Sequence, residues 1–216
     1  MKICLFIGML AGAAVLPASA ALYTSASGYV NGSGTSLNLA IPAGNPSGVS
    51  SSMTVSTLPD NNIQSMTVTL NVSGGYNGSL YAYLSYDGTL VTLLNRVGTG
   101  EGSEPQTTFG FSTSGFNNIT LADGSMSNIH DVQNPVSGTT YGPDGGNLAS
   151  FNGANPNGTW TLFFASMAGG DTSTLEGWSL DITAVPEPVN LALVIFGGLV
   201  VVWNVVCWRR NRVLLA

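Results

Sequence analysis

Apolar and polar residues alternate most regularly in the middle of the chain. Residues 66–72 place an apolar side chain at every second position, a pattern that is typical of a strand with one buried face. Residues 80–86 repeat the pattern, and Asp87-Gly88 then provides a tight turn before the apolar run 89–95. These positions predict one strand followed by a β-hairpin.

Two later segments alternate in the same way. Residues 160–164 and 178–182 each begin with a tryptophan, and the alternation predicts two strands whose tryptophans face the core. Shorter strands are predicted at 107–111 and 118–121. The polar, Gly-rich stretch 125–157 is expected to be irregular loop.

Between positions 21 and 184, no segment shows helical periodicity over three turns. About eight short antiparallel strands separated by turn residues predict an all-β sandwich. Residues 66–184 are expected to form this sandwich. Residues 21–65, which are rich in Ser, Gly, Thr, Asn and Pro, are expected to add one or two N-terminal strands and long loops.

The first 20 residues predict a signal peptide. Lys2 precedes the apolar run 3–16, and the small residues Ala18 and Ala20 provide a cleavage site. We expect cleavage after Ala20, which would release an exported protein. An uncleaved N-terminal anchor is the alternative, and the short apolar run disfavours it.

The C-terminal region predicts one transmembrane helix. Residues 189–208 are almost entirely apolar and long enough to cross a bilayer as a helix. The tail 209–216 is basic through Arg209, Arg210 and Arg212, which are expected to stop transfer and remain in the cytoplasm. The domain before the helix is therefore expected on the periplasmic side of the inner membrane.

A short motif, Pro186-Glu187-Pro188, lies within residues 185–188 and directly precedes this helix. Its prolines keep the backbone extended, where a processing enzyme can reach it. The order of Pro-Glu-Pro, one apolar helix and an arginine cluster resembles the PEP-CTERM sorting signal of exported bacterial proteins. The resemblance implies an exosortase-like sorting enzyme as a partner, an exopolysaccharide-rich envelope, and passage to the outer envelope or cell surface. A simple membrane anchor with an incidental Pro-Glu-Pro is the alternative.

Charged residues are few and unevenly distributed. The chain has five basic and 11 acidic residues, but residues 21–184 contain a single basic residue, Arg96, and ten acids. The resulting net charge of −9 argues against nucleic acid as a partner, because phosphate binding requires clustered lysine and arginine. Cys4 and Cys207 lie in the predicted signal peptide and membrane helix, so the exported domain has no cysteine for a disulfide.

The two tryptophan-containing segments carry a second resemblance. Their motifs, G-x-W-x-L and L-x-x-W-x-L, are built from Gly158, Trp160, Leu162, Leu175, Trp178 and Leu180. Together with the predicted hairpin they resemble the P domain (Homo B) of the proprotein convertases. The resemblance implies a jelly-roll, galactose-binding-like β-sandwich of the kind that supports the folding of subtilisin-like catalytic domains. A generic jelly roll is the alternative.

A catalytic role is not expected for this chain. A Ser-His-Asp protease needs a histidine as its general base, and the sequence contains one histidine, His130. The neighbouring Asp131 is not expected to orient it, because adjacent residues of an extended strand point in opposite directions. We therefore expect a non-enzymatic protein in which His130 is a hydrogen-bonded structural residue.

Calcium is the cation that the acidic loops would suit, because it prefers carboxylate and carbonyl oxygens. Asp171 and Glu176 are the first candidates for a calcium site, and Asp123, Asp131 and Asp144 are others. The alternative is that these acids only solvate a surface that lacks lysine.

Tyrosines provide a further candidate site, a sugar-stacking surface, and the residues in question are Tyr76, Tyr81, Tyr83, Tyr86 and Tyr141. Tyr81 and Tyr83 are expected on the strand face opposite Leu80 and Leu84. The alternative, which we favour at this stage, is a sheet that is covered on both sides.

These observations favour an exported cell-envelope protein whose P-domain-like sandwich is a non-catalytic structural or binding module at an exopolysaccharide-rich surface. An accessory P domain that supports a separate subtilisin-like serine endopeptidase is the alternative, and a hydrolase with an unrecognised site is a third hypothesis.

Overall fold

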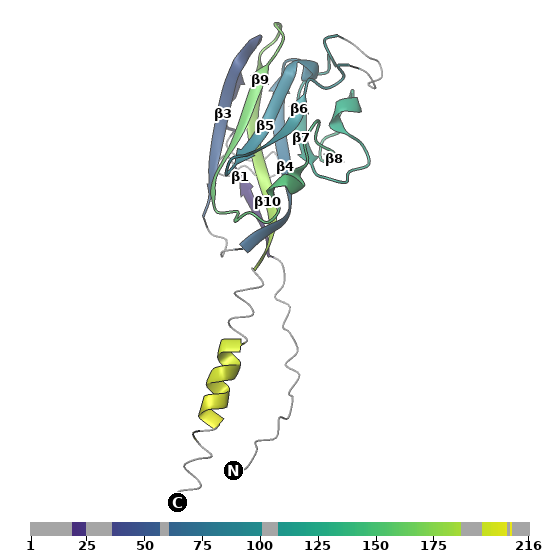
Figure 1. The fold of residues 1–216 in the computed structure, drawn as a ribbon. Helices are drawn as coiled ribbons and strands as arrows, with labels where there is room; N and C mark the ends of the chain where they lie inside the picture. The colour runs from purple at the N-terminus through teal and green to yellow at the C-terminus, as the bar shows by residue number, and fades with distance from the viewer. Residues whose placement is uncertain are drawn as a thin grey trace, which may run out of the picture.

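The computed structural model describes residues 19–24, 36–56, 61–100, 108–186, 196–206 and 208. Between residues 19 and 186 these residues form two packed β-sheets joined by turns and loops, including long connections over residues 122–139 and 142–157 (Figure 1). The structure is therefore a β-sandwich, as the alternating pattern predicts.

The larger sheet has six strands within the described residues. Its order is β1 (Ser19–Thr24), β10 (Ser173–Pro186), β4 (Asn61–Gly74), β7 (Phe116–Leu121) and β8 (Thr140–Tyr141), and β2 (Leu39–Ile41) also pairs with β10. The pairs are antiparallel except that β7 and β8 run parallel.

The smaller sheet has four antiparallel strands among the described residues. Its order is β3 (Asn45–Val55), β9 (Gly158–Ser166), β5 (Leu80–Tyr86) and β6 (Thr89–Asn95). Three short 3-10 helices lie in the connections: η1 (Asn77–Ser79), η2 (Ile129–Asp131) and η3 (Leu148–Phe151).

The predicted hairpin is confirmed by β5 and β6. Its two turn residues have positive φ angles, 46° at Asp87 and 75° at Gly88, as a tight two-residue β-turn requires. Gly at the second position adopts this conformation without the steric cost that a Cβ would add. The turn chemistry in the sequence therefore determines the register of this hairpin.

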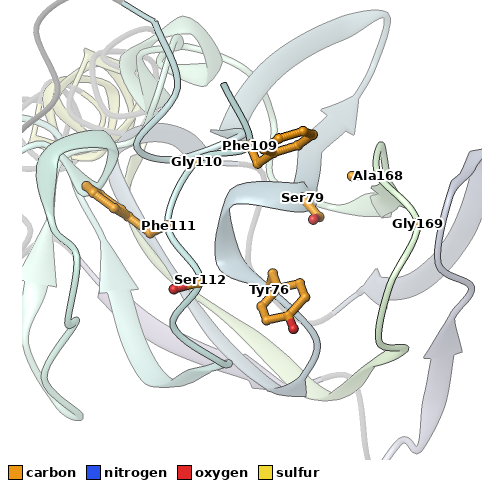
Figure 2. Close-up of a pocket in the computed structure, with 8 residues that line it drawn as sticks. All are labelled: Tyr76, Ser79, Phe109, Gly110, Phe111, Ser112, Ala168 and Gly169. Atoms are coloured by element: carbon orange, nitrogen blue, oxygen red, sulfur yellow. The ribbon is translucent and has the colours of Figure 1, made fainter. Parts of the chain in front are cut away.

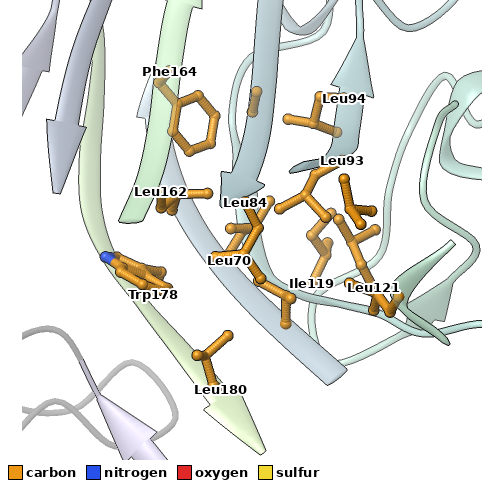
Figure 3. Packing of buried hydrophobic residues seen from close by; sticks show 14 of the residues in the cluster. Leu70, Leu84, Leu93, Leu94, Ile119, Leu121, Leu162, Phe164, Trp178 and Leu180 are labelled. Atoms are coloured by element: carbon orange, nitrogen blue, oxygen red, sulfur yellow. The ribbon is translucent and has the colours of Figure 1, made fainter. Parts of the chain in front are cut away.

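The core lies between the two sheets. In β4, Met66, Val68, Leu70 and Val72 are buried, as the period-two pattern predicts. Figure 3 shows leucine, isoleucine and aromatic side chains of both sheets converging in this layer. Apolar burial of this extent is the main stabilising contribution to folding.

Both tryptophans of the P-domain-like motifs are fully buried, and they lie in different sheets. Trp160 in β9 donates its indole N–H to the carbonyl of Pro156 at 3.0 Å. Trp178 in β10 donates to the Ser51 hydroxyl of β3 at 2.9 Å, so this bond joins the two sheets. The motif leucines Leu162, Leu175 and Leu180 are buried as well; the P-domain assignment itself remains a prediction.

The strand predicted at 107–111 is wrong for residues 108–111, which form a turn and irregular chain. The backbone N–H of Phe111 donates to Val97 at 3.0 Å, and its carbonyl accepts from Gly78 at 2.9 Å. Phe111 is buried, as an alternating pattern would suggest, but its backbone connects two loops rather than two strands. Residue 107 lies outside the described residues.

The N-terminal third contributes more regular structure than the prediction of one or two strands. β1 and β2 pair with β10, and the 11-residue β3 forms one edge of the smaller sheet. Residues 66–184 and the strands that precede them therefore belong to the same two sheets.

The transmembrane helix predicted over residues 189–208 is not shown. The structure describes a helix at residues 196–206 and 208, and within the described residues no helix has both the length and the hydropathy required to cross a membrane. Ala20 lies in β1 opposite Thr183, and Pro186 ends β10 opposite Asn61.

Several predicted targeting residues lie outside the described residues. These are residues 1–18 with Ala18 of the cleavage site, Glu187 and Pro188 of the sorting motif, and the basic residues Arg209, Arg210 and Arg212.

Candidate functional site

A pocket of about 190 Å³ lies at the end of the smaller sheet where β5 begins and β9 ends. It is lined by Tyr76, Ser79, Phe109, Gly110, Phe111, Ser112, Ala168 and Gly169. In the view of Figure 2, Ser79 lies between the rings of Tyr76 and Phe109. The lining comes from three segments that are far apart in the sequence.

The aromatic residues of the pocket differ in exposure. Phe109 is 74% exposed and Tyr76 is 41% exposed, whereas Phe111 is buried. Ser79 and Ser112 supply hydroxyl groups, and no lining residue is charged. An exposed aromatic pair beside a concave, largely apolar surface is a feature of ligand-binding sites. The chemistry of the lining suits an uncharged group with one apolar face.

Backbone hydrogen bonds and a close glycine contact hold the segments that line the pocket together. Asn77 donates its backbone N–H to Thr113 at 2.8 Å, and Met167 donates to Ser79 at 2.7 Å. Gly78 lies so close to Gly110 that an added Cβ would be 2.5 Å from the Gly110 backbone. This close approach requires glycine at position 78, because any side chain would separate the two segments.

His130 lies in a different part of the loops and bonds through both ring nitrogens. Its Nδ1 is 2.8 Å from Oδ2 of Asp144, and its Nε2 is 2.8 Å from the carbonyl oxygen of Thr99. Asp144 is buried, and the same Oδ2 accepts the backbone N–H of Asn95 at 2.9 Å. The carboxylate that contacts His130 is therefore that of Asp144. The neighbouring Asp131 is exposed.

Two acceptors face the imidazole, and this arrangement favours the protonated ring. Burial alone lowers the pKa of His130, but the hydrogen bond and charge of Asp144, the Thr99 carbonyl and the charge of Asp131 together raise it above the ordinary 6.5. A general base needs a free nitrogen near its nucleophile, and both nitrogens are engaged here. The geometry supports a structural His130 that holds three loops together.

Glu176, the second predicted calcium ligand, is the extra residue of a β-bulge in β10, between Leu175 and Gly177. Its carboxylate accepts the hydroxyl of Ser73 at 2.6 Å and also the hydroxyl of Ser36. These two hydrogen bonds lower the pKa of Glu176, and burial acts weakly in the opposite direction. Glu176 therefore connects the chain before β2 to the larger sheet.

The predicted calcium ligands do not form a cluster of three or more acidic side chains in the described part of the structure. Asp171 is exposed in the β9–β10 loop, and Asp123 accepts the backbone N–H groups of Leu148 and Ala149 at 2.9 and 2.7 Å. Among the described residues, no group of three or more His, Cys, Asp or Glu could hold a metal ion. Calcium binding by Asp171 and Glu176 remains a prediction.

The five tyrosines of the predicted sugar-stacking surface are dispersed. Tyr86 is buried against Trp160, with ring centroids 4.0 Å apart, and its hydroxyl donates to Asn157 at 2.8 Å. Tyr141 is buried too, and its hydroxyl accepts the backbone N–H of Val136 at 2.9 Å. The hypothesis that all five tyrosines form a single sugar-stacking surface is therefore wrong.

Tyr81 and Tyr83 lie on the outer face of β5, as the alternation predicts. The ring of Tyr83 stacks on Phe163 of β9 with a centroid distance of 4.7 Å, and Tyr81 meets Tyr83 edge-on at 6.2 Å. Phe163 and the pocket residue Phe109 were not among the candidates from the sequence. Only the register of β9 on β5 brings Phe163 to Tyr83, and Phe109 lies in the segment mistaken for a strand.

Comparison with known proteins gives few matches. No family model matches the chain, and no curated protein matches it. Among solved structures, the chain is similar to a serine protease of Aeromonas sobria, with 16% sequence identity and a TM-score of 0.46 over 79% of this chain. A structure of the Aeromonas sobria serine protease (ASP) with its chaperone (ORF2) gives 18% identity and a TM-score of 0.44 over 79% of this chain. The chain spans 28% of the length of both matched chains.

Proposed function

We propose that this protein is an exported cell-envelope protein whose β-sandwich is a non-catalytic binding module at an exopolysaccharide-rich surface. The observation that carries the proposal is the pocket between Tyr76 and Phe109, which combines exposed aromatic rings, two hydroxyl groups and an uncharged lining.

Sugar rings suit such a lining. The C–H groups on one face of a pyranose pack against aromatic rings, while its hydroxyl groups exchange hydrogen bonds with serine side chains and backbone groups. Tyr76 and Phe109 offer the rings, and Ser79 and Ser112 offer the hydroxyls. A small pocket of this kind would hold one sugar unit of a longer polymer.

The predicted targeting segments support the proposed location of this module in the cell envelope. Residues 1–20 have the order of a secretory signal, and Pro186-Glu187-Pro188 is followed by an apolar segment and an arginine cluster. In the structure β10 ends at Pro186, so the proposed sorting motif begins where the sandwich ends. An exosortase-like enzyme would then act on a segment directly beside the folded domain.

The geometry of His130 supports a non-catalytic role. Removing a proton from a substrate with this ring would require it to give up its bond to Asp144 or to Thr99. Each of these bonds also fixes a loop of the sandwich, so catalysis through His130 would cost local structure.

The test is retention of the full chain, purified from membranes in detergent, on exopolysaccharide from its own envelope. We expect the Tyr76→Ala and Phe109→Ala variants to bind more weakly by about threefold to tenfold each. Met126→Ala is the matched control, because Met126 is a fully exposed apolar residue outside the pocket. Unchanged retention of both pocket variants would refute the proposed site. Co-purification of a subtilisin-like serine protease without glycan retention would favour the accessory role instead.

A further inference from the structure

The outer face of the smaller sheet carries aromatic and hydroxyl side chains and no charge. We define this uncharged face by Tyr81, Tyr83, Phe163, Ser50, Ser52 and Thr161. None of the four strands β3, β9, β5 and β6 contains an Asp, Glu, Lys or Arg residue. In the larger sheet, β1, β2, β4, β7 and β8 also lack charged residues, so it is the aromatic rings that distinguish this face from positions 67, 69 and 71 of β4, which are Thr, Thr and Asn.

The strand register arranges these side chains in rows across the sheet. Ser50 of β3 lies opposite Phe163 of β9, which lies opposite Tyr83 of β5. In the next row, Ser52 lies opposite Thr161, and their hydroxyls are 2.9 Å apart. Aromatic rings therefore occupy the middle of the face, and hydroxyl groups that can exchange further hydrogen bonds flank them.

The uncharged face begins beside the pocket. Ser79 lines the pocket and is the last residue of η1, and β5, which carries Tyr81 and Tyr83 at alternate positions, begins at the next residue. Side chains at alternate positions point to the same side of a strand, and β5 from residue 80 to residue 86 covers about 20 Å at about 3.3 Å per residue. A ligand on this face has an extended track rather than a single small cavity.

We propose that the uncharged face binds a neutral polysaccharide chain along β5. The inference rests on the proposed binding role, but it places the ligand on a different surface from the pocket. The half-buried rings of Tyr81, Tyr83 and Phe163 offer apolar surface to the C–H groups of sugar units, and the serine and threonine hydroxyls match their hydroxyl groups.

The charge of the protein favours a neutral polymer over an anionic one as the ligand. The face offers no Lys or Arg to pair with carboxylate or sulfate groups, and the net charge of −9 over residues 21–184 repels a polyanion. A protein partner fits less well, because interface cores are poor in serine, and serine and threonine rarely contribute binding hot spots.

The experiment measures retention of the full chain, in detergent, on two immobilised neutral polysaccharides, a β-glucan and a mannan, with alginate as the anionic comparison. We expect binding to at least one neutral polymer and weaker binding to alginate. Tyr83→Ala and Phe163→Ala should each weaken binding by about threefold to tenfold.

A second variant avoids any loss of packing. Ser50→Glu places a charge at an exposed position opposite Phe163 and should weaken binding without removing a buried group. Gln64→Glu is the matched control, because Gln64 is an exposed strand residue of the larger sheet. Thermal unfolding of every variant separates loss of binding from loss of the fold.

The outcomes distinguish this inference from the proposed function. If the pocket variants lose binding and the three face variants do not, the face inference is overturned while the proposed function stands. If wild type binds neither neutral polymer nor its own exopolysaccharide, both proposals fail. Stronger binding to alginate, or a dimer in solution that Ser50→Glu dissociates, would also overturn the inference.

Discussion

His130 and Asp144 form an ion pair, with Nδ1 and Oδ2 2.8 Å apart, although 14 positions separate them in the sequence. The pair joins η2 to the loop that follows β8, and the Nε2 bond to Thr99 adds the loop that follows β6. Gly98 of that loop also donates its backbone N–H to His130 at 2.9 Å, and it packs against the ring of Phe111 beneath the pocket. The pair is therefore connected to the pocket through Gly98 and Phe111.

This pair predicts a pH-dependent contribution to stability. Because the pKa of His130 is raised above 6.5, the stabilisation is fully present below about pH 6.5 and is lost as the pH rises through the folded-state pKa. We expect His130→Gln to lower the free energy of unfolding by about 1 kcal/mol at pH 5.5 and by less at pH 8.5. Urea unfolding at both pH values measures the difference. An equal loss at both would show that the charge on His130 does not matter.

Glu176 predicts the opposite dependence on pH. Its pKa is lowered by the bonds from Ser36 and Ser73, so its contribution is present above the ordinary value of 4.5 and is lost as the pH falls through the folded-state pKa. The carboxylate is only partly buried, so we expect Glu176→Gln to cost less than about 1 kcal/mol at pH 7, and the cost should shrink as the pH falls through the folded-state pKa. Asp171→Asn is the control. A loss that persists at low pH would assign the effect to packing.

Gly78 and Gly110 predict a steric requirement at the pocket. Gly78→Ala would place a Cβ 2.5 Å from the backbone of Gly110, so the two segments must separate. We expect a loss of about 1–3 kcal/mol in the free energy of unfolding and weaker glycan retention. Gly142→Ala is the matched control, because its Cβ would make ordinary contacts at 3.6 Å. Equal effects of the two substitutions would contradict the close approach.

The targeting segments predict the mass of the mature protein recovered from its native envelope. Cleavage after Ala20 and processing at the sorting motif would leave a protein that starts at residue 21 and ends between residues 186 and 188. Intact-mass spectrometry measures both ends at once. A mass that retains residues 209–216 would show a permanent anchor and refute the sorting proposal.

Local patterns in the sequence determined several elements of this fold. The alternation of Met66, Val68, Leu70 and Val72 identifies β4, and Asp87-Gly88 identifies the β5–β6 hairpin. Both rest on properties of neighbouring residues: alternate side chains point to opposite faces of a strand, and a tight hairpin turn needs positive φ angles. The same alternation places Tyr81 and Tyr83 on the outer face of β5.

The candidate sites depend on tertiary structure. Residues 109–111 resemble a strand by composition, but the backbone bonds of Phe111 to Val97 and Gly78 hold them as a connection. Phe109 is then exposed at the pocket that Tyr76 also lines. His130 meets Asp144 rather than the adjacent Asp131, and Tyr83 meets Phe163 through the pairing of β5 with β9. Such partners are distant in sequence, and they are selected by which strands and loops pack together. That selection depends on the burial and backbone hydrogen bonding of the whole sandwich, which no local pattern contains.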